Sequence, residues 1–385
     1  MNLLLILRRK FEQVPVEIKY TFCLFLLTRT VFTLVGIFSR IEFDHLGLYN
    51  HTWVLNKHLW LDIWSISDSA WYLDIVAQGY PHKLTGHNAL FYGFFPLYPL
   101  AIFIFNKLFG SPYITAIAIS NICLILSCSF LYKLMRLDHD ENTSLKSIKY
   151  LFLFPGTFIL SGIFSESLFL LLLIMCFYYA KQRNWILTGT AGFFLALTRP
   201  NGILVLFPIL VEYFNSKDQD LKKTSFDIFY LLLFIGGLLV FTLYCYIKTG
   251  NPTAYVWAKK VGWGTYPSNP FKMIINHLFN LNTGFTLTTI YSLTILLLLI
   301  VFRKVIGTSY FLLGLIFFWF PYIMAGDHHS NGIVRHLCYL FPAYVLFAKL
   351  GAKNEHLDKT LSVFLFILQI ILFTIWCTNL KSMIV

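Results

Sequence analysis

Residues 65–80 read SISDSAWYLDIVAQGY, a polar and aromatic stretch that carries two carboxylates within an otherwise apolar chain. It follows the first long apolar run, and a second aromatic segment, FFPLYP at residues 94–99, comes soon after it. Carboxylates are costly in the hydrocarbon core of a bilayer. The stretch therefore predicts a structured loop that lies outside the membrane, with the apolar segments arranged around it.

The composition of the chain indicates a polytopic membrane protein of the all-α class. Of its 385 residues, 57% are hydrophobic and 12% are charged, whereas a soluble domain carries about 25% charged residues. In water such a chain would expose an apolar surface. The net charge of +12 comes from short Lys and Arg clusters between apolar runs, which is typical of the positive-inside bias rather than of a nucleic-acid-binding stripe.

Apolar runs that can cross a bilayer, some of them short, set the expected helices. We expect about 11 transmembrane spans, at residues 20–39, 113–133, 149–161, 164–180, 185–198, 202–214, 226–247, 285–302, 308–325, 336–350 and 360–379. The run at 94–110 is short and is interrupted by Pro96, Pro99 and Gly110, so we expect an interfacial helix there. Residues 1–385 are predicted to form one membrane domain, with 40–112 as a helical first outer loop.

Charge clusters assign the loops to sides of the membrane. With the N-terminus inside, the inner loops hold the basic clusters Arg8/Arg9/Lys10, Arg136/Lys146/Lys149, Lys181/Arg183, Lys217/Lys222/Lys223, Arg303/Lys304 and Lys353/Lys359. The short outer loops hold only Arg199 and Arg335, and the span centres are almost free of charge. This alternation supports the span count and predicts chemistry at the outer, periplasmic or luminal face. Short loops and rich Lys, Ile, Asn and Phe usage favour a bacterial plasma membrane over an endoplasmic reticulum membrane.

The opening stretch predicts a helix from about Ser69 to Gln78 that ends at Gly79. Asp68 at its start has two compatible interpretations: it caps the helix, or it is a general base whose ionised form the helix dipole favours. Asp74 lies six residues further on, about 120° away around the helix axis. The two carboxylates therefore do not converge, and Asp68 alone is the catalytic candidate.

Several segments, taken in order, resemble one family of membrane mannosyltransferases. They are DSAWY at 68–72 with IVAQGY at 75–80, FFPLYP at 94–99, SESLF at 165–169, LTRPNG at 197–202, and the weaker pieces RHL at 335–337 and LFP at 340–342. The family is that of the enzyme that adds the second mannose in glycosylphosphatidylinositol (GPI) anchor synthesis, together with its bacterial relatives. The resemblance covers about residues 60–345.

This resemblance implies a GT-C glycosyltransferase fold. It also implies a polyprenyl-phosphate (dolichyl-type) hexose donor, with mannose as the expected sugar, a glycan or glycolipid acceptor, and an inverting mechanism. Asp68 would be the functional acidic residue of the first outer loop. The family often has Arg-Trp directly before this Asp, where this chain has Ile66-Ser67, and this departure concerns the acceptor contacts around Asp68.

The leaving group of such a donor is a phosphate, and charge that grows on it needs fixed cations. Arg199 and Arg335 are candidates because guanidinium binds phosphate in a two-pronged way, and Lys259 with its neighbour Lys260 is a second choice. Each arginine also has an ordinary interpretation at the end of a span, as a terminator or a headgroup anchor. Glu166 either caps a span or takes part in substrate binding.

The remaining candidates for substrate binding are Asn201, in the same motif as Arg199, and the aromatic residues Trp71 and Tyr72. These rings either stack on a sugar or belong to an interfacial aromatic belt. We assign no cofactor and no metal, because the one ligand-like cluster, Asp327-His328-His329, lacks diagnostic spacing.

Two other classes of function stay open: a transporter or flippase of lipid-linked glycans, and a glycan ligase or polymerase. Transporters place ionisable sites near the bilayer midplane and often repeat their halves, and neither feature is visible in the sequence. Ligases and polymerases usually place their largest loop late in the chain, whereas the longest loop here is the first. The lipid-linked glycosyltransferase is therefore the favoured hypothesis.

Overall fold

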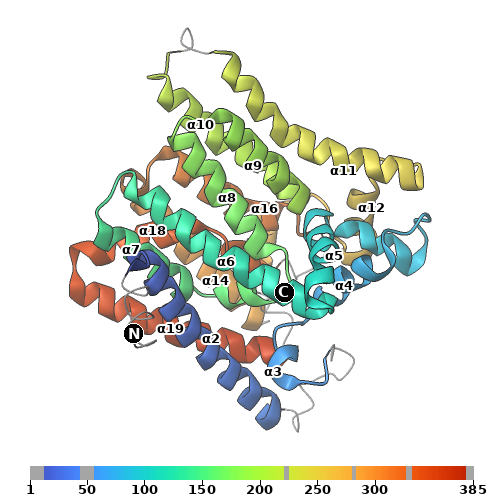
Figure 1. Ribbon diagram of the computed structural model, residues 1–385, viewed down its shortest axis with the longest axis horizontal. Helices are drawn as coiled ribbons and strands as arrows, with labels where there is room; N and C mark the ends of the chain where they lie inside the picture. Colours follow the sequence, from blue (N-terminus) through green and yellow to red (C-terminus); the bar gives the residue numbers. More distant parts are fainter. Residues whose placement is uncertain (1–12, 44–55, 221–224, 280–282, 327–331, 379–385) are drawn as a thin grey trace, which may run out of the picture.

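The computed structural model describes residues 13–43, 56–220, 225–279, 283–326 and 332–378 (Figure 1). Within these ranges the chain is all-helical, without a strand, as the composition predicted. Its helices, in which η marks a 3-10 helix, are α2 (Val16–Phe43), α3 (Leu59–Asp62), α4 (Ser69–Gln78), η3 (Gly86–Gly93), α5 (Leu97–Phe109), α6 (Pro112–Arg136), α7 (Glu141–Leu153), η4 (Thr157–Ser161), α8 (Glu166–Lys181), α9 (Trp185–Thr198), η5 (Pro200–Val205), α10 (Leu206–Ser216), η7 (Phe226–Leu232), α11 (Leu233–Thr249), α12 (Ala254–Trp263), α13 (Pro270–Phe279), α14 (Thr283–Val301), α15 (Arg303–Ile306), α16 (Thr308–Ile323), α17 (Ile333–Leu337), α18 (Phe341–Lys353) and α19 (Glu355–Cys377).

Five of the described helical segments are long and apolar enough to cross a membrane: Val16–Phe43, Pro112–Arg136, Phe226–Thr249, Gly284–Val301 and Glu355–Cys377. Shorter apolar helices accompany them, among them α9 and α16. The chain is thus a multi-pass membrane protein. Each of the 11 predicted intervals contains helix, but the number of full crossings stays a prediction.

Two of the predicted spans are broken helices, and proline explains both breaks. The interval 149–161 divides into α7 and η4, because Phe154 precedes Pro155 and is extended, with φ −68° and ψ 133°. The interval 336–350 divides into α17 and α18, and Pro342 stands in the first turn of α18, where its missing N–H costs no hydrogen bond. The prediction of single continuous spans was wrong at these two places.

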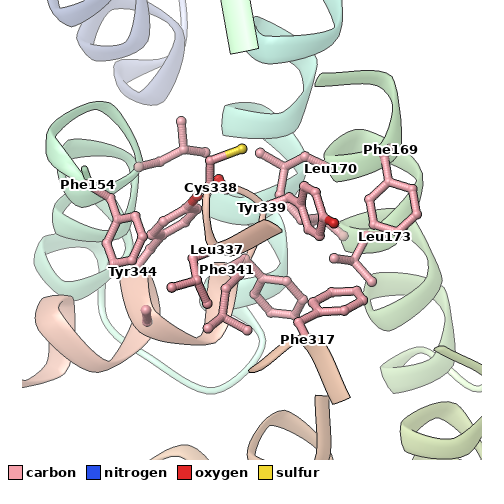
Figure 2. Packing of buried hydrophobic residues seen from close by; sticks show 14 of the residues in the cluster. Phe154, Phe169, Leu170, Leu173, Phe317, Leu337, Cys338, Tyr339, Phe341 and Tyr344 are labelled. Carbon is pink, nitrogen blue, oxygen red and sulfur yellow. Dashed lines mark hydrogen bonds between the residues drawn. The ribbon is translucent and has the colours of Figure 1, made fainter. Parts of the chain in front are cut away.

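The break between α17 and α18 lies inside the bundle core. Figure 2 shows Leu337, Cys338, Tyr339 and Phe341 between Phe154 and Tyr344 on one side and Phe169 and Leu173 on the other. The Tyr344 hydroxyl donates to the Cys338 carbonyl, and the Leu340 N–H donates to the Leu337 carbonyl at 3.0 Å. Non-helical backbone is tolerated at such depth where it is buried in protein and its polar groups are satisfied.

The loop between α2 and α6 forms a helical cap at one side of the bundle. In Figure 1, α4, α5 and α12 gather there, away from α7 and α18. A second apolar core joins the cap to α11, through Tyr72, Phe94, Tyr98 and Phe241 among others. Helix α5 has 13 residues, about 20 Å at 1.5 Å per residue, which is too short for a hydrocarbon core of about 30 Å.

The opposite side of the bundle carries some of the basic residues that were assigned to inner loops. Asp358 at the start of α19 accepts hydrogen bonds from Lys146 at 2.5 Å and Lys149 at 2.7 Å. Lys181 at the end of α8 pairs with Asp138. These contacts hold the helix ends together on that side, and its cytoplasmic orientation stays a prediction.

One charge lies midway along a span, contrary to the expectation of nearly uncharged span centres. Arg29 of α2 donates from Nε to the Ser161 hydroxyl at 2.6 Å. Its guanidinium carbon lies 5.6–5.9 Å from the ring centroids of Phe25, Phe32, Trp64 and Phe152. Surrounding rings and a buried hydroxyl stabilise the charge there, and the contact ties α2 to η4.

Candidate active site

Helix α4 has the predicted bounds, but Asp68 does not cap it. The helix ends at Gly79, whose φ of 72° is favourable for glycine and whose N–H donates to the Ile75 carbonyl at 2.8 Å. Asp68 has right-handed helical angles and makes no capping hydrogen bond. Its neighbour Ser67 turns the chain in the left-handed region, with φ 58°. The capping interpretation was therefore wrong, and the Asp68 carboxylate is available for another contact.

That contact is the first in a chain of buried ion pairs. Arg335 of α17 donates from Nη1 to Asp68 Oδ2 and from Nε to Glu166 Oε1. Arg199, at the end of α9, donates from Nη1 to the same Glu166 oxygen. Four residues from four distant segments thus meet, and the Glu166 side chain is fully buried between the two arginines. Pairing of this kind offsets the cost of burying charged groups.

Short connections hold the segment before α8 against the Asp68 loop. The Ile163 N–H donates to the Trp64 carbonyl at 3.0 Å, and the Ser69 hydroxyl donates to the Ile163 carbonyl at 3.2 Å. The Tyr72 hydroxyl donates to Ser165 Oγ at 2.9 Å. Since Glu166 follows directly, these bonds fix the carboxylate that orients both arginines.

A cavity of about 380 Å³ lies beside the ion pairs. Asp68, Tyr72, Arg199, Asn201, Arg335 and Lys259 all line it. Its aromatic wall comes from the cap and from α12, with Phe94, Phe95, Tyr255 and Trp263.

Lys259 lies over this aromatic wall. Its Nζ is 4.4 Å from the Trp263 ring centroid and 5.2 Å from that of Phe94, which are cation–π distances. Helix α12 approaches η3 closely, because a Cβ on Gly93 would lie 2.8 Å from the Trp263 ring. Glycine at position 93 therefore lets α12 bring Lys259 to the cavity.

The charged groups of the site sum to a net positive charge. Three cations (Arg199, Arg335 and Lys259) face two carboxylates (Asp68 and Glu166), which gives +1. Burial lowers the pKa of Lys259 to about 8, against the opposing effect of Asp68. Burial acts against the charge of Arg335 as well, but Glu166 and Asp68 raise the pKa of that guanidinium well above its usual value. The arrangement suits an anionic ligand.

Two predicted substrate-binding residues lie behind the cavity wall. Trp71 packs against the Phe94 ring, with centroids 5.7 Å apart, and against the Trp263 ring at 5.9 Å. Glu166 reaches the cavity only through the arginines that it pairs with. Asp74, which was excluded as a catalytic partner of Asp68, and Lys260, a second choice of cation, are both exposed. Neither lines the cavity.

Sequence reasoning missed several residues that line the cavity. Tyr255 and Trp263 lie four residues on either side of Lys259, so all three share one face of α12. This spacing could have been found in the sequence. His336 also lines the cavity, and its position next to Arg335 in the resemblance motif was the available signal.

The described part of the structure identifies no metal site. Asp327-His328-His329 lies outside the described residues. Within the described ranges, no group of three or more His, Cys, Asp or Glu side chains is placed to hold a metal ion.

No protein-family model matches the chain, and no curated protein sequence matches it. Two solved structures of the oligosaccharyltransferase from Archaeoglobus fulgidus are similar to it. One carries a tethered acceptor peptide with the NVT sequon: its TM-score is 0.45 and its identity 12%, over 93% of this chain and 55% of that one. The other is a complex with Zn and sulfate, with a TM-score of 0.43 and 11% identity over 90% and 53%.

The chain therefore spans about half the length of these solved structures. At such TM-scores we base the functional proposal on the site geometry, and the resemblance to the second-mannose family stays a prediction.

Proposed function

We propose that the protein is a membrane glycosyltransferase of the GT-C type. It would move a hexose, with mannose as the expected sugar, from a polyprenyl phosphate to a hydroxyl of a glycan or glycolipid acceptor. The transfer would invert the anomeric centre at the outer face of the membrane. The observation that carries this proposal is the meeting of Asp68, Arg335, Glu166 and Arg199 beside one aromatic-walled cavity.

Asp68 has the position and the free atom that a general base requires. Its Oδ2 accepts from Arg335, whereas Oδ1 has no hydrogen-bond partner among the described residues. Oδ1 would take the proton of the acceptor hydroxyl as that oxygen attacks the anomeric carbon.

The cations would stabilise the departing phosphate. Arg335 Nη2 and Arg199 Nη2 make no hydrogen bond within the described part of the chain, so each guanidinium keeps donors for a ligand. Lys259 has no carboxylate within ion-pairing distance there. Donors already aimed at the site of growing negative charge lower the barrier without reorganising during the reaction.

The test of the general base is Asp68→Asn, with Asp74→Asn as the matched control on the same helix. Purified variants would be assayed with radiolabelled polyprenyl-phosphate mannose and a cell-envelope glycan extract. We expect Asp68→Asn to lower kcat by at least about 100-fold, since a general base contributes roughly 10²–10⁴-fold. The variant should still fold and insert, because Arg335 keeps its ion pair with Glu166. The exposed Asp74→Asn should keep full activity.

Normal turnover by Asp68→Asn would contradict the assignment of Asp68 as the general base. Absence of transfer by the unmodified protein from every polyprenyl-phosphate hexose would instead remove the proposed function as a whole.

A further inference from the structure

His336 belongs to a short hydrogen-bond chain that ends at the cavity. Its Nδ1 lies 2.5 Å from the hydroxyl of Tyr339, three residues further along the chain and just beyond the end of α17. Asn201 of η5 donates from Nδ2 to the same hydroxyl at 3.1 Å. Tyr339 is fully buried and Asn201 is 1% exposed, while His336 and Asn201 line the cavity.

The donor order in this chain fixes the tautomer of His336. The Tyr339 hydroxyl accepts from Asn201 and has a single proton, and we assign that proton to the hydrogen bond with His336 Nδ1. The ring proton of a neutral His336 then resides on Nε2. Nε2 has no hydrogen-bond partner among the described residues, and the Phe320 ring packs edge-on against the imidazole at 5.7 Å.

The surroundings keep His336 neutral. Arg199, Arg335 and Lys259 line the same cavity as His336, and their positive charges oppose a further positive charge on the imidazole. His336 is therefore not a further cation for a phosphate. It is a neutral N–H donor beside three cations.

We propose that His336 determines sugar specificity by donating an Nε2–H hydrogen bond to one hydroxyl of the transferred sugar, with Tyr339 and Asn201 as positioning residues. This inference rests on the proposed function and names the group that the cavity recognises. A hydroxyl oxygen is a neutral acceptor that matches a neutral donor, whereas the phosphate has the free arginine donors available. Buried donors that lose their partner discriminate strongly against a substrate that lacks the matching hydroxyl.

The test pairs protein variants with singly deoxygenated donors. Transfer would be measured for polyprenyl-phosphate mannose and for a series in which each sugar hydroxyl in turn is replaced by hydrogen. The variants are His336→Ala, His336→Gln (whose amide nitrogen can take the place of Nε2) and Tyr339→Phe. His356→Ala, exposed at the start of α19, is the control and should behave as the unmodified protein.

We expect His336→Ala to lower kcat/KM with the full donor by about tenfold, the loss of one well-placed hydrogen bond. With the unmodified protein, one deoxygenated donor should lower kcat/KM by the same factor. With His336→Ala, that donor should react as well as the full donor. His336→Gln should recover part of the activity. Tyr339→Phe should lower discrimination against that same donor, which a merely structural role would not do.

Additive losses for every deoxygenated donor would overturn the inference while the proposed function stands. So would weaker binding of sugar-free polyprenyl phosphate by His336→Ala, because it would place the contact on the phosphate. If His336→Ala does not fold, His336→Gln and Tyr339→Phe decide by the same comparison. An unmodified protein that transfers no hexose would remove both proposals.

Discussion

Asp68 lies at the start of helix α4, but its carboxylate forms an ion pair with Arg335 and does not cap the helix. The backbone at Asp68 is already helical, so the side chain cannot reach the free N–H groups of the first turn in the way a cap does. The left-handed turn at Ser67 precedes it. One carboxylate oxygen is thereby held by a cation, and Asp68 lines the cavity, which is a suitable arrangement for proton abstraction.

At the residue scale, Lys259 gives the site a pH dependence. Its pKa of about 8, lowered by burial, means that the ammonium predominates below that pH and is lost above it. We expect the donor KM to rise between about pH 7 and about pH 9, by up to tenfold per unit above the pKa. Lys259→Arg, which does not titrate in this range, should flatten this profile.

The exposed neighbour supplies the control for this profile, since Lys260→Arg should leave it unchanged. A donor KM that rises equally in the Lys259→Arg protein would contradict the role given to Lys259.

Arg335 and Arg303 provide a second comparison of single residues. Arg335→Ala would leave Asp68 without its cation and Glu166 with only Arg199, which typically costs about 3–5 kcal/mol for a buried pair. Thermal unfolding in detergent should show a large loss, and binding of polyprenyl phosphate should weaken. Arg303→Ala, at an exposed position of α15, should change neither measurement.

Arg335→Lys separates stability from binding. It keeps the charge but not the two-pronged geometry, so we expect a folded protein with weakened use of the donor. Equal effects of Arg335→Ala and Arg303→Ala would contradict the placement of these residues at opposite ends of the bundle.

At the scale of elements, the site depends on helices that stop inside the bundle. Helices α7, α9 and α17 each end or break near a proline. The segments that follow run at the level of the site and supply Glu166 and Asn201. A break in a helix lets the chain change direction, so that the segment after the break can cross other segments closely. Gly156 marks such a crossing, against Val334 of α17.

Substitution of Gly156 tests this crossing. Gly156 has φ 90°, and an added Cβ would lie 2.7 Å from Val334 Cγ1, whereas Gly110, with φ 66°, has open space around it. Gly110→Ala should cost about 1 kcal/mol from backbone strain alone. Gly156→Ala should cost about 1–3 kcal/mol more from overpacking, as measured by thermal unfolding.

Val334→Ala offers a check on the steric part. Combined with Gly156→Ala it should recover a portion of the stability that the clash removed. Equal losses for the two glycine substitutions would show that the contact with Val334 is unimportant.

At the scale of the whole molecule, the two ends of the bundle differ in chemistry. One end carries the cap, the cavity and the ion-pair chain. The other carries lysines paired with Asp358 and Asp138. The positive-inside bias then predicts that the cavity faces the outside.

Labelling with a membrane-impermeant maleimide tests this orientation in intact cells. Of the seven cysteines only Cys23 is exposed, so a Cys23→Ser background limits the signal to an introduced thiol. We expect Lys260→Cys, in α12 beside the cavity, to be labelled from outside, and Lys304→Cys to react only after the cells are opened. The reverse pattern would place the site in the cytoplasm.

Local physical chemistry determined which parts of this fold could be read from the sequence alone. Hydrophobicity set the membrane class and the helical intervals, and Gly79 set the end of α4, because these properties depend on a residue and its near neighbours. The same local rules predicted continuous spans at 149–161 and 336–350, whereas the structure breaks them near Pro155 and Pro342. They did not predict that a charge is tolerated at Arg29, because the Ser161 hydroxyl and the Trp64 and Phe152 rings come from other segments of the chain.

Only the tertiary structure decided the contacts of the site. Asp68 and Arg335 are 267 positions apart, and Glu166 lies 169 from Arg335. Nothing in the sequence around either residue encodes such a pairing, because it arises from the packing of whole helices. The sequence by itself predicted that the candidate site residues lie together at the outer side of a membrane bundle. The packing decided that Asp68 holds an ion pair instead of a helix cap, and that His336 stands beside it.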